Sequence, residues 1–252
     1  MTILDNQTTR LELDSHQVGQ AIELLPKQLL QVIADFKNRT PQKLQSPINK
    51  IVLNGMGGSN LGARLIASAL ADKLPLPLII EPGYTVPAYI DEQTLYIVSS
   101  YSGTTEEPLS TVTEVQKRGA QLAAITADTE GNPLAQMARG NNWPAYIFTT
   151  KNNPSGQPRL GLGYAIFGLL GLLGTLDIMP FDLSTAETIV KQLEETGRRW
   201  LPEVPTEEND AKQLALQLQN RQIWLIGPDK LTGNLHILRN QINETSKNLA
   251  NY

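Results

Sequence analysis

Short apolar segments alternate with longer helical segments through most of this chain, and this alternation constrains the fold more than any other feature. The short segments have the length and composition of buried strands. They lie at residues 50–54, 78–80, 94–99, 121–126 and 145–148. Strands that alternate with helices of ten or more residues imply a parallel sheet covered by helices on both faces. The sequence therefore predicts an α/β fold built on a doubly wound parallel sheet.

The same patterns divide the chain into four parts. Apolar residues recur at helical spacing over 15–38, and near the other end a helix at 210–219, a strand at 222–227 and an amphipathic helix at 232–249 follow one another. One strand cannot form a stable parallel sheet, so we expect this last unit to be incomplete. The predicted parts are an N-terminal helix, a sheet domain, a connecting helix with linker, and the start of a second domain, at residues 1–45, 46–180, 181–209 and 210–252.

Composition excludes several classes of function. A formal net charge of −4 gives no long-range attraction for nucleic acid or anionic lipid, so we expect neither nucleic acid nor membrane as a partner. The absence of cysteine excludes disulfides and thiol chemistry, and two isolated histidines, His16 and His236, are too few for the usual zinc centre. The N-terminal residues have neither the basic start nor the apolar core of a secretion signal, so we expect a cytoplasmic protein.

One uncharged stretch, residues 160–176, has two interpretations. Its length is close to the lower limit for a membrane span, and Arg159 and Asp177 close it at either end. It also carries regularly spaced glycines, which give a helix a small-residue face for close packing. A buried helix is the favoured interpretation because the rest of the chain has the pattern of a globular α/β protein.

A glycine-rich loop between the first strand and its helix is the first candidate site. In the sequence Asn-Gly-Met-Gly-Gly-Ser-Asn-Leu-Gly at 54–62, Gly57 and Gly58 let backbone N–H groups face an anion, and Ser59 adds a hydroxyl. This pattern predicts a phosphate cradle. A dinucleotide site, with Glu81 as the ribose-binding acid, and a tight packing turn are the alternatives.

A second loop, which follows the strand at 94–99, is rich in hydroxyl groups. Ser100, Ser102, Thr104 and Thr105 lie within six positions at the start of a helix, and the loop has no lysine or arginine. We expect hydroxyl and N–H groups to surround one phosphate there. The alternative is an ordinary Ser/Thr helix cap, which needs fewer hydroxyl groups than are present.

Four motifs together are typical of one family. Gly-Met-Gly-Gly-Ser at 55–59 and Ser-Tyr-Ser-Gly-x-Thr-Glu-Glu at 100–107 resemble the sugar isomerase (SIS) domain, a flavodoxin- or Rossmann-like three-layer fold. Pro-Arg-x-x-x-Gly-Tyr at 158–164, and Gly233 with Gln-Ile-Asn-Glu-x-x-Lys at 241–247, resemble the bifunctional phosphoglucose/phosphomannose isomerase family in particular. The resemblance extends over roughly residues 50 to 250.

The resemblance implies a function and a site. It implies isomerisation of glucose 6-phosphate or mannose 6-phosphate to fructose 6-phosphate through a cis-enediol, without metal or other cofactor, in a homodimer of carbohydrate metabolism. Glu244 corresponds to the family's base and Arg159 to the arginine that stabilises the enediol. Proton transfer between C1 and C2 needs such a carboxylate and cation. Apart from the motif, the two residues would be a solvated helix glutamate and a loop arginine.

Two parts of the family's site are not found in this sequence. The family opens the sugar ring with a histidine that soon follows the glutamate helix, and it has a lysine near its C-terminus. His236 lies eight residues before Glu244, about 12 Å along a helix, so we expect it to be structural, and we expect His16 to be exposed. We therefore expect a C-terminally truncated family member. A non-catalytic phosphosugar-binding SIS module and a nicotinamide-binding oxidoreductase are the alternatives.

Overall fold

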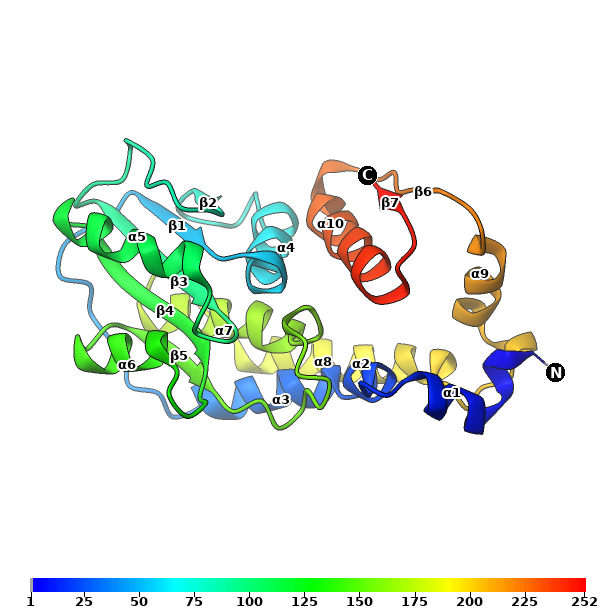
Figure 1. Cartoon of the computed structure of the whole chain (residues 1–252). Coiled ribbons are helices and arrows are strands. Elements are labelled where there is room, and N and C mark those ends of the chain that lie inside the picture. Colours follow the sequence, from blue (N-terminus) through cyan, green and yellow to red (C-terminus); the bar gives the residue numbers. More distant parts are fainter. Residues whose placement is uncertain (1) are drawn as a thin grey trace.

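The computed structural model describes residues 2–252 and contains a five-stranded sheet in which all neighbouring strands are parallel (Figure 1). Its strands are β1 (Lys50–Asn54), β2 (Leu78–Ile80), β3 (Thr94–Ser100), β4 (Gln121–Ala127) and β5 (Ala145–Phe148). Their spatial order is β2-β1-β3-β4-β5, which is the flavodoxin-like order of a doubly wound sheet. The predicted fold class is confirmed.

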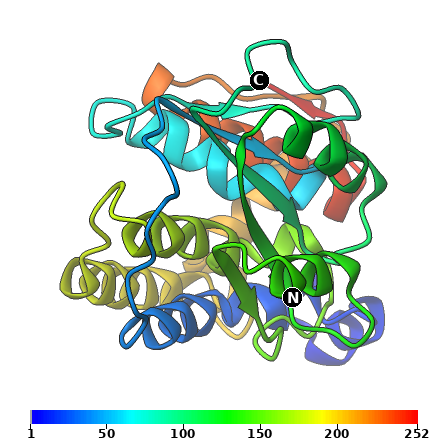
Figure 2. The ribbon, with the colours of Figure 1, turned by 90° about the vertical axis from the view of Figure 1, so that its left-hand side faces the viewer.

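Helices cover both faces of this sheet (Figure 2). One face packs against α3 (Leu25–Phe36), α4 (Leu61–Ala69) and α7 (Leu162–Thr175), with α8 (Leu183–Gly197) packed on α3, and the other against α5 (Glu106–Lys117) and α6 (Pro133–Gly140). Successive strand residues enter opposite cores because side chains alternate along a strand. In β3, for example, Leu95 and Ile97 join the first core while Tyr96 and Val98 join the second.

The N-terminal helix predicted at 15–38 is wrong as a single element. The chain forms α1 (Gln7–Leu13), α2 (Val18–Glu23) and α3, with a break at Leu24. Pro26 explains this break, because proline has no amide hydrogen to donate to the carbonyl of Ile22. Helix α3 nevertheless buries the predicted apolar face through Leu29, Val32, Ile33 and Phe36.

The apolar segment 160–176 forms α7, a buried helix of 14 residues, as favoured from the sequence. Its glycines allow close approach, since an added Cβ at Gly168 or Gly171 would lie 2.5 Å from the ring of Tyr146 or Phe36. Within residues 2–252, no helix is both long enough and apolar enough to cross a membrane.

The last part of the chain differs from its prediction. It forms α9 (Asp210–Leu218), β6 (Ile223–Trp224), α10 (Thr232–Gln241), a π-helical turn (Ile242–Ser246) and β7 (Ala250–Asn251). The helix predicted to reach residue 249 is wrong, because Lys247 adopts the left-handed conformation with φ 54° and ends the helical segment. The chain then turns back, and β7 pairs in parallel with β6.

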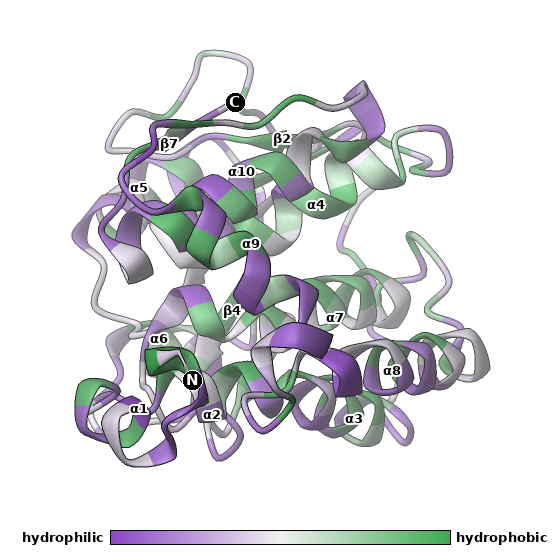
Figure 3. Ribbon diagram, turned by 90° about the vertical axis from the view of Figure 1, so that its right-hand side faces the viewer, coloured by the Kyte–Doolittle hydropathy of each residue, from purple (hydrophilic) through white to green (hydrophobic). Residues whose placement is uncertain are grey.

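Helix α10 packs directly on α4, as Figure 3 shows from the side. The contact is close because Gly233 has no side chain: an added Cβ there would lie 2.5 Å from the carbonyl oxygen of Arg64. Helix α8 packs on the first core through Ala186 and Val190. Short 3₁₀ turns complete the chain at Ile3–Asp5, Gly57–Asn60, Pro158–Leu160, Arg198–Trp200, Thr206–Glu208 and Asp229–Leu231. The division into domains at the predicted boundaries stays a prediction.

The packing of α7 on α3 predicts a stability difference between two glycines. We expect Gly171→Ala to lower the free energy of unfolding by about 1–3 kcal/mol, because the new methyl group overpacks against Phe36. Gly197→Ala, at the end of α8 with nothing within 4 Å, should be neutral or stabilise by up to about 1 kcal/mol. Urea denaturation measures both. Equal effects of the two substitutions would contradict this account of α7.

Candidate active site

The two predicted phosphate loops meet where the winding of the sheet reverses. Strands β1 and β3 are neighbours, but the chain leaves β1 toward β2 at one edge and leaves β3 toward β4 and β5 at the other. A crevice forms outside the carboxyl ends of strands at such a point, and ligands of doubly wound folds bind there. Loop 55–60, after β1, and loop 101–105, after β3, both lie at this edge.

Hydrogen bonds join the two loops directly. The Ser59 hydroxyl oxygen accepts a bond of 2.9 Å from the Tyr101 amide, and the Ser99 hydroxyl donates one of 2.8 Å to the Ser59 carbonyl. Gly57 has a φ of +46°, a backbone conformation that glycine adopts readily because glycine has no Cβ. Ser59 therefore fixes the spacing between the two loops.

The hydroxyl groups of the second loop are hydrogen-bonded within the loop. The buried Ser100 oxygen accepts a 3.0 Å bond from the Gly103 amide and lies 2.7 Å from the Thr105 hydroxyl. The Thr104 hydroxyl donates to the exposed Ser102 oxygen at 3.0 Å. Thr105 precedes α5, but its side chain makes no capping bond to that helix. The hydroxyl groups thus organise the loop itself, and Ser102 and Thr104 present theirs to solvent.

Arg159 lies against the first loop because Gly58 allows it. An added Cβ at Gly58 would be 2.5 Å from the Arg159 amide nitrogen. The Arg159 side chain is 15% exposed, and its Nη1 donates a 2.8 Å hydrogen bond to Oε1 of Gln157. The same nitrogen lies 3.7 Å from Oε2 of Glu244, which is 44% exposed. The fold thus brings together the two predicted catalytic residues, which are far apart in the sequence.

Glu244 reaches Arg159 from the π-helical turn after α10. Two neighbours on the same helical segment contact Arg159 as well: the Gln241 amide donates to its carbonyl oxygen at 2.6 Å, and the Thr245 hydroxyl accepts from its Nε at 3.1 Å. Single π turns are rare and occur frequently at functional sites. Sequence reasoning missed Thr245 and Gln157, because no motif or periodicity marks either residue.

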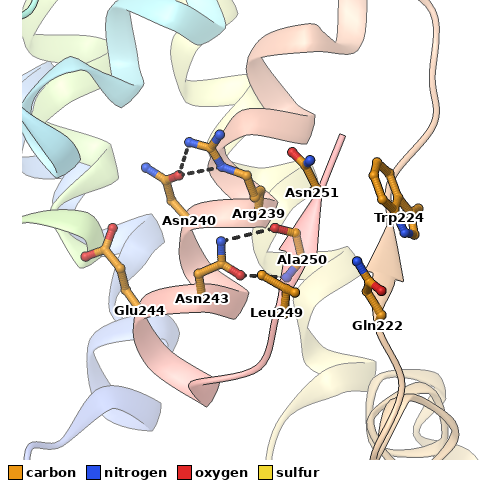
Figure 4. A pocket seen from close by; sticks show the side chains of 9 residues that line it. All are labelled: Gln222, Trp224, Arg239, Asn240, Asn243, Glu244, Leu249, Ala250 and Asn251. Atoms are coloured by element: carbon orange, nitrogen blue, oxygen red, sulfur yellow. Dashed lines mark hydrogen bonds between the residues drawn. The ribbon is translucent and has the colours of Figure 1, made fainter.

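Glu244 also borders a pocket of about 500 Å³ between α10 and the strands β6 and β7. Figure 4 shows its carboxylate directed away from Trp224. Arg239 and Asn240 are hydrogen-bonded to each other in this pocket at 2.7 Å. Glu244 therefore stands between this pocket and Arg159.

A buried polar cluster supports the same edge of the sheet and was not predicted. The Asn54 amide, at the end of β1, donates to the carbonyl of Gly83 and to the Tyr96 hydroxyl, each at 3.0 Å. Tyr96 donates in turn to Thr111 of α5 at 3.2 Å. All three of these side chains are buried. The cluster therefore connects the strand before the first loop to the helix after the second.

Other predicted residues lie elsewhere or have other partners. Glu81, the ribose-binding acid of the dinucleotide alternative, accepts a hydrogen bond from Tyr89. His16 is exposed, as predicted. Nδ1 of His236 lies 3.0 Å from the Tyr252 hydroxyl, and burial together with the cations Arg64 and Arg239 lowers the pKa of His236 to about 4. Within residues 2–252, no group of three or more His, Asp or Glu side chains is placed to hold a metal ion.

Comparison with known proteins supports the class of fold. Residues 46–152 match the model of the SIS domain. The bifunctional phosphoglucose/phosphomannose isomerase of Caldicellulosiruptor bescii is 36% identical over 92% of this chain and 66% of its own length. The protein of the same name from Thermoplasma volcanium is 29% identical over 80% and 58%, respectively. A candidate phosphosugar isomerase of Clostridium difficile 630 shares the fold, with a TM-score of 0.65, 13% identity, and coverage of 92% of this chain and 67% of its own.

This chain contains an SIS domain. The flavodoxin-like sheet, the two joined loops and the match over residues 46–152 together identify it. Within that class, the chain resembles the bifunctional phosphoglucose/phosphomannose isomerase family along 92% of its length. The chain spans 66% and 58% of the lengths of the two relatives named above.

The surroundings of His236 predict the pH at which its imidazole takes up a proton. Because its pKa is lowered to about 4, the imidazole is neutral at neutral pH, whereas an unfolded histidine titrates near 6.5. The unfolded state therefore binds more protons between these values, and stability falls as the pH is lowered from about 6.5 toward 4. ¹H NMR of the imidazole C2 proton, identified by its loss in His236→Gln, should give a midpoint near 4. A midpoint near 6.5 would contradict the described environment.

Proposed function

We propose that this protein is a sugar-phosphate isomerase that interconverts fructose 6-phosphate with glucose 6-phosphate or mannose 6-phosphate. The observation that carries this proposal is the pairing of Arg159 with Glu244 at 3.7 Å, directly beside two joined loops of glycine and hydroxyl residues. A phosphate group and a reacting carbon chain could bind side by side there. The names of the similar proteins favour this substrate class.

We propose that the loops hold the phosphate through neutral dipoles. The ligands would be backbone amides at Gly57 and Gly58 together with hydroxyl groups of the two loops. The proposed hydroxyl ligands are those of Ser59, Ser100, Ser102, Thr104 and Thr105. The start of α5 adds the positive end of a helix dipole, which favours an anion. This arrangement is consistent with a net charge of −4, since a local site replaces long-range attraction.

We propose that Glu244 is the base and that Arg159 stabilises the intermediate. From fructose 6-phosphate in its open form, the Glu244 carboxylate would remove a proton from C1, and the carbonyl oxygen at C2 would gain a proton, giving the cis-enediol. Return of the proton to C2, with loss of the hydroxyl proton at C1, would form the aldose. The Arg159 guanidinium would stabilise negative charge that develops on the oxygens at C1 and C2.

We also propose, from the family resemblance, that two chains form a homodimer with the site near the domain and subunit boundary, and that the protein acts in the cytoplasm without metal or other cofactor. The proposed domains are those at 46–180 and 210–252, with Arg159 in the first and Glu244 in the second. The 3.7 Å contact between the two side chains would then lie at the domain boundary.

The assignment of the base predicts a large and specific loss of activity. With fructose 6-phosphate as substrate, Glu244→Gln should lower kcat by about 10²–10⁴-fold, because the amide cannot accept the proton. Glu187→Gln, an exposed position on α8, is the matched control and should retain full activity. In D₂O the wild-type protein should form aldose that carries deuterium at C2, since the proton on Glu244 exchanges with solvent.

Two results would count against this proposal. Unchanged turnover in Glu244→Gln would show that Glu244 is not the base. Calorimetric binding of fructose 6-phosphate by the wild-type protein without any aldose formation would favour the alternative of a non-catalytic phosphosugar-binding module.

A further inference from the structure

The orientation of the Arg159 guanidinium is fixed from two sides. Thr245 accepts a hydrogen bond from Nε at 3.1 Å, and Gln157 accepts one from Nη1 at 2.8 Å. The guanidinium is planar, with its five N–H bonds in a fixed geometry, so two such bonds determine its plane. Within the described chain, no hydrogen bond engages Nη2 of Arg159. Both N–H groups of Nη2 are therefore available to a substrate oxygen.

Two consecutive residues of the π-helical turn at Ile242–Ser246 contact the same arginine. Side chains at i and i+1 of a helix do not face each other. Glu244 and Thr245 accordingly approach different atoms of the guanidinium, Glu244 near Nη1 and Thr245 at Nε.

The hydrogen bond between Arg159 and Thr245 is directional, whereas the ion pair between Arg159 and Glu244 is not. The Glu244 oxygen lies 3.7 Å from Nη1, which is an ion pair but too long for a hydrogen bond. A carboxylate at this distance attracts the positive charge without fixing the rotation of the guanidinium plane. The bond from Nε to the Thr245 hydroxyl does fix it, together with the bond from Nη1 to Gln157.

We infer that Thr245 is a positioning residue of the isomerase site: its hydroxyl orients Arg159 so that Nη2 faces the oxygens of the enediol. This inference rests on the proposed function. Thr245 acts through Arg159 and does not itself touch the reacting atoms. Its loss therefore weakens stabilisation of the intermediate while leaving the phosphate loops unchanged.

Kinetics of three variants test this inference. Thr245→Val, which keeps the shape and removes the hydroxyl, should lower kcat about tenfold or more and change KM for fructose 6-phosphate less than about twofold. Thr245→Ser should restore kcat to within about threefold of wild type, because it restores the acceptor. Thr188→Val is the matched control, since the Thr188 hydroxyl bonds only within α8, to the Ser184 carbonyl. A wild-type kcat in Thr245→Val would overturn the inference, and so would failure of Thr245→Ser to recover.

A second readout is independent of turnover. The ¹⁵Nε–¹Hε NMR signal of Arg159, identified by its loss in Arg159→Lys, should exchange slowly with solvent in the wild type and in Thr245→Ser, and at least about tenfold faster in Thr245→Val. Equal exchange in all three proteins would overturn the inference. If the wild-type protein shows no turnover while exchange depends on Thr245, the positioning contact stands and the proposed isomerase function fails.

Discussion

The backbone of Gly58 lies directly against the peptide that joins Pro158 to Arg159, and the rest of the candidate site depends on this contact. It brings a loop at the end of β1 against a turn that lies about a hundred residues later in the sequence. Any side chain at position 58 would collide with backbone atoms at 2.5 Å, so only glycine allows Arg159 to reach the edge of the sheet where the two loops meet.

Helix α4 connects this contact to Glu244, the other candidate catalytic residue. The helix follows the first loop, and its Arg64–Leu65 backbone accepts the close approach of α10 at Gly233. Helix α10 leads into the π turn that carries Glu244. Two close contacts at glycine, of Gly58 with Arg159 and of Gly233 with Arg64, thus set the distance between Arg159 and Glu244. The first glycine-rich loop and the pair of Arg159 and Glu244 are parts of one packed unit.

Much of the fold followed from local patterns in the sequence. The five strands have strong local signals, because strands buried on both faces are nearly continuous apolar runs. Two predicted helices were wrong because a single residue ended each helix although the apolar periodicity continued. Pro26 breaks the first helix, and Lys247, with its left-handed backbone, ends the second. Periodicity reports which face is apolar, and it does not report where one helix ends and another begins.

The candidate site was predicted only in part. The glycine and hydroxyl loops have local chemical patterns, and Arg159 and Glu244 were identified by family resemblance. The contacts of Thr245 with Arg159 and of Asn54 with Tyr96 join residues 86 and 42 positions apart, and no spacing rule connects such pairs. They depend on how the helices pack, which becomes visible only in three dimensions.

The most direct measurement is a crystal structure of the Glu244→Gln variant with bound fructose 6-phosphate. We expect the phosphate oxygens to lie within about 3 Å of amides or hydroxyl groups in both loops, and C1 and C2 to lie between residue 244 and the Arg159 guanidinium. A phosphate bound away from the edge where β1 and β3 end, or a sugar whose C1 and C2 lie far from Arg159, would contradict the proposed site.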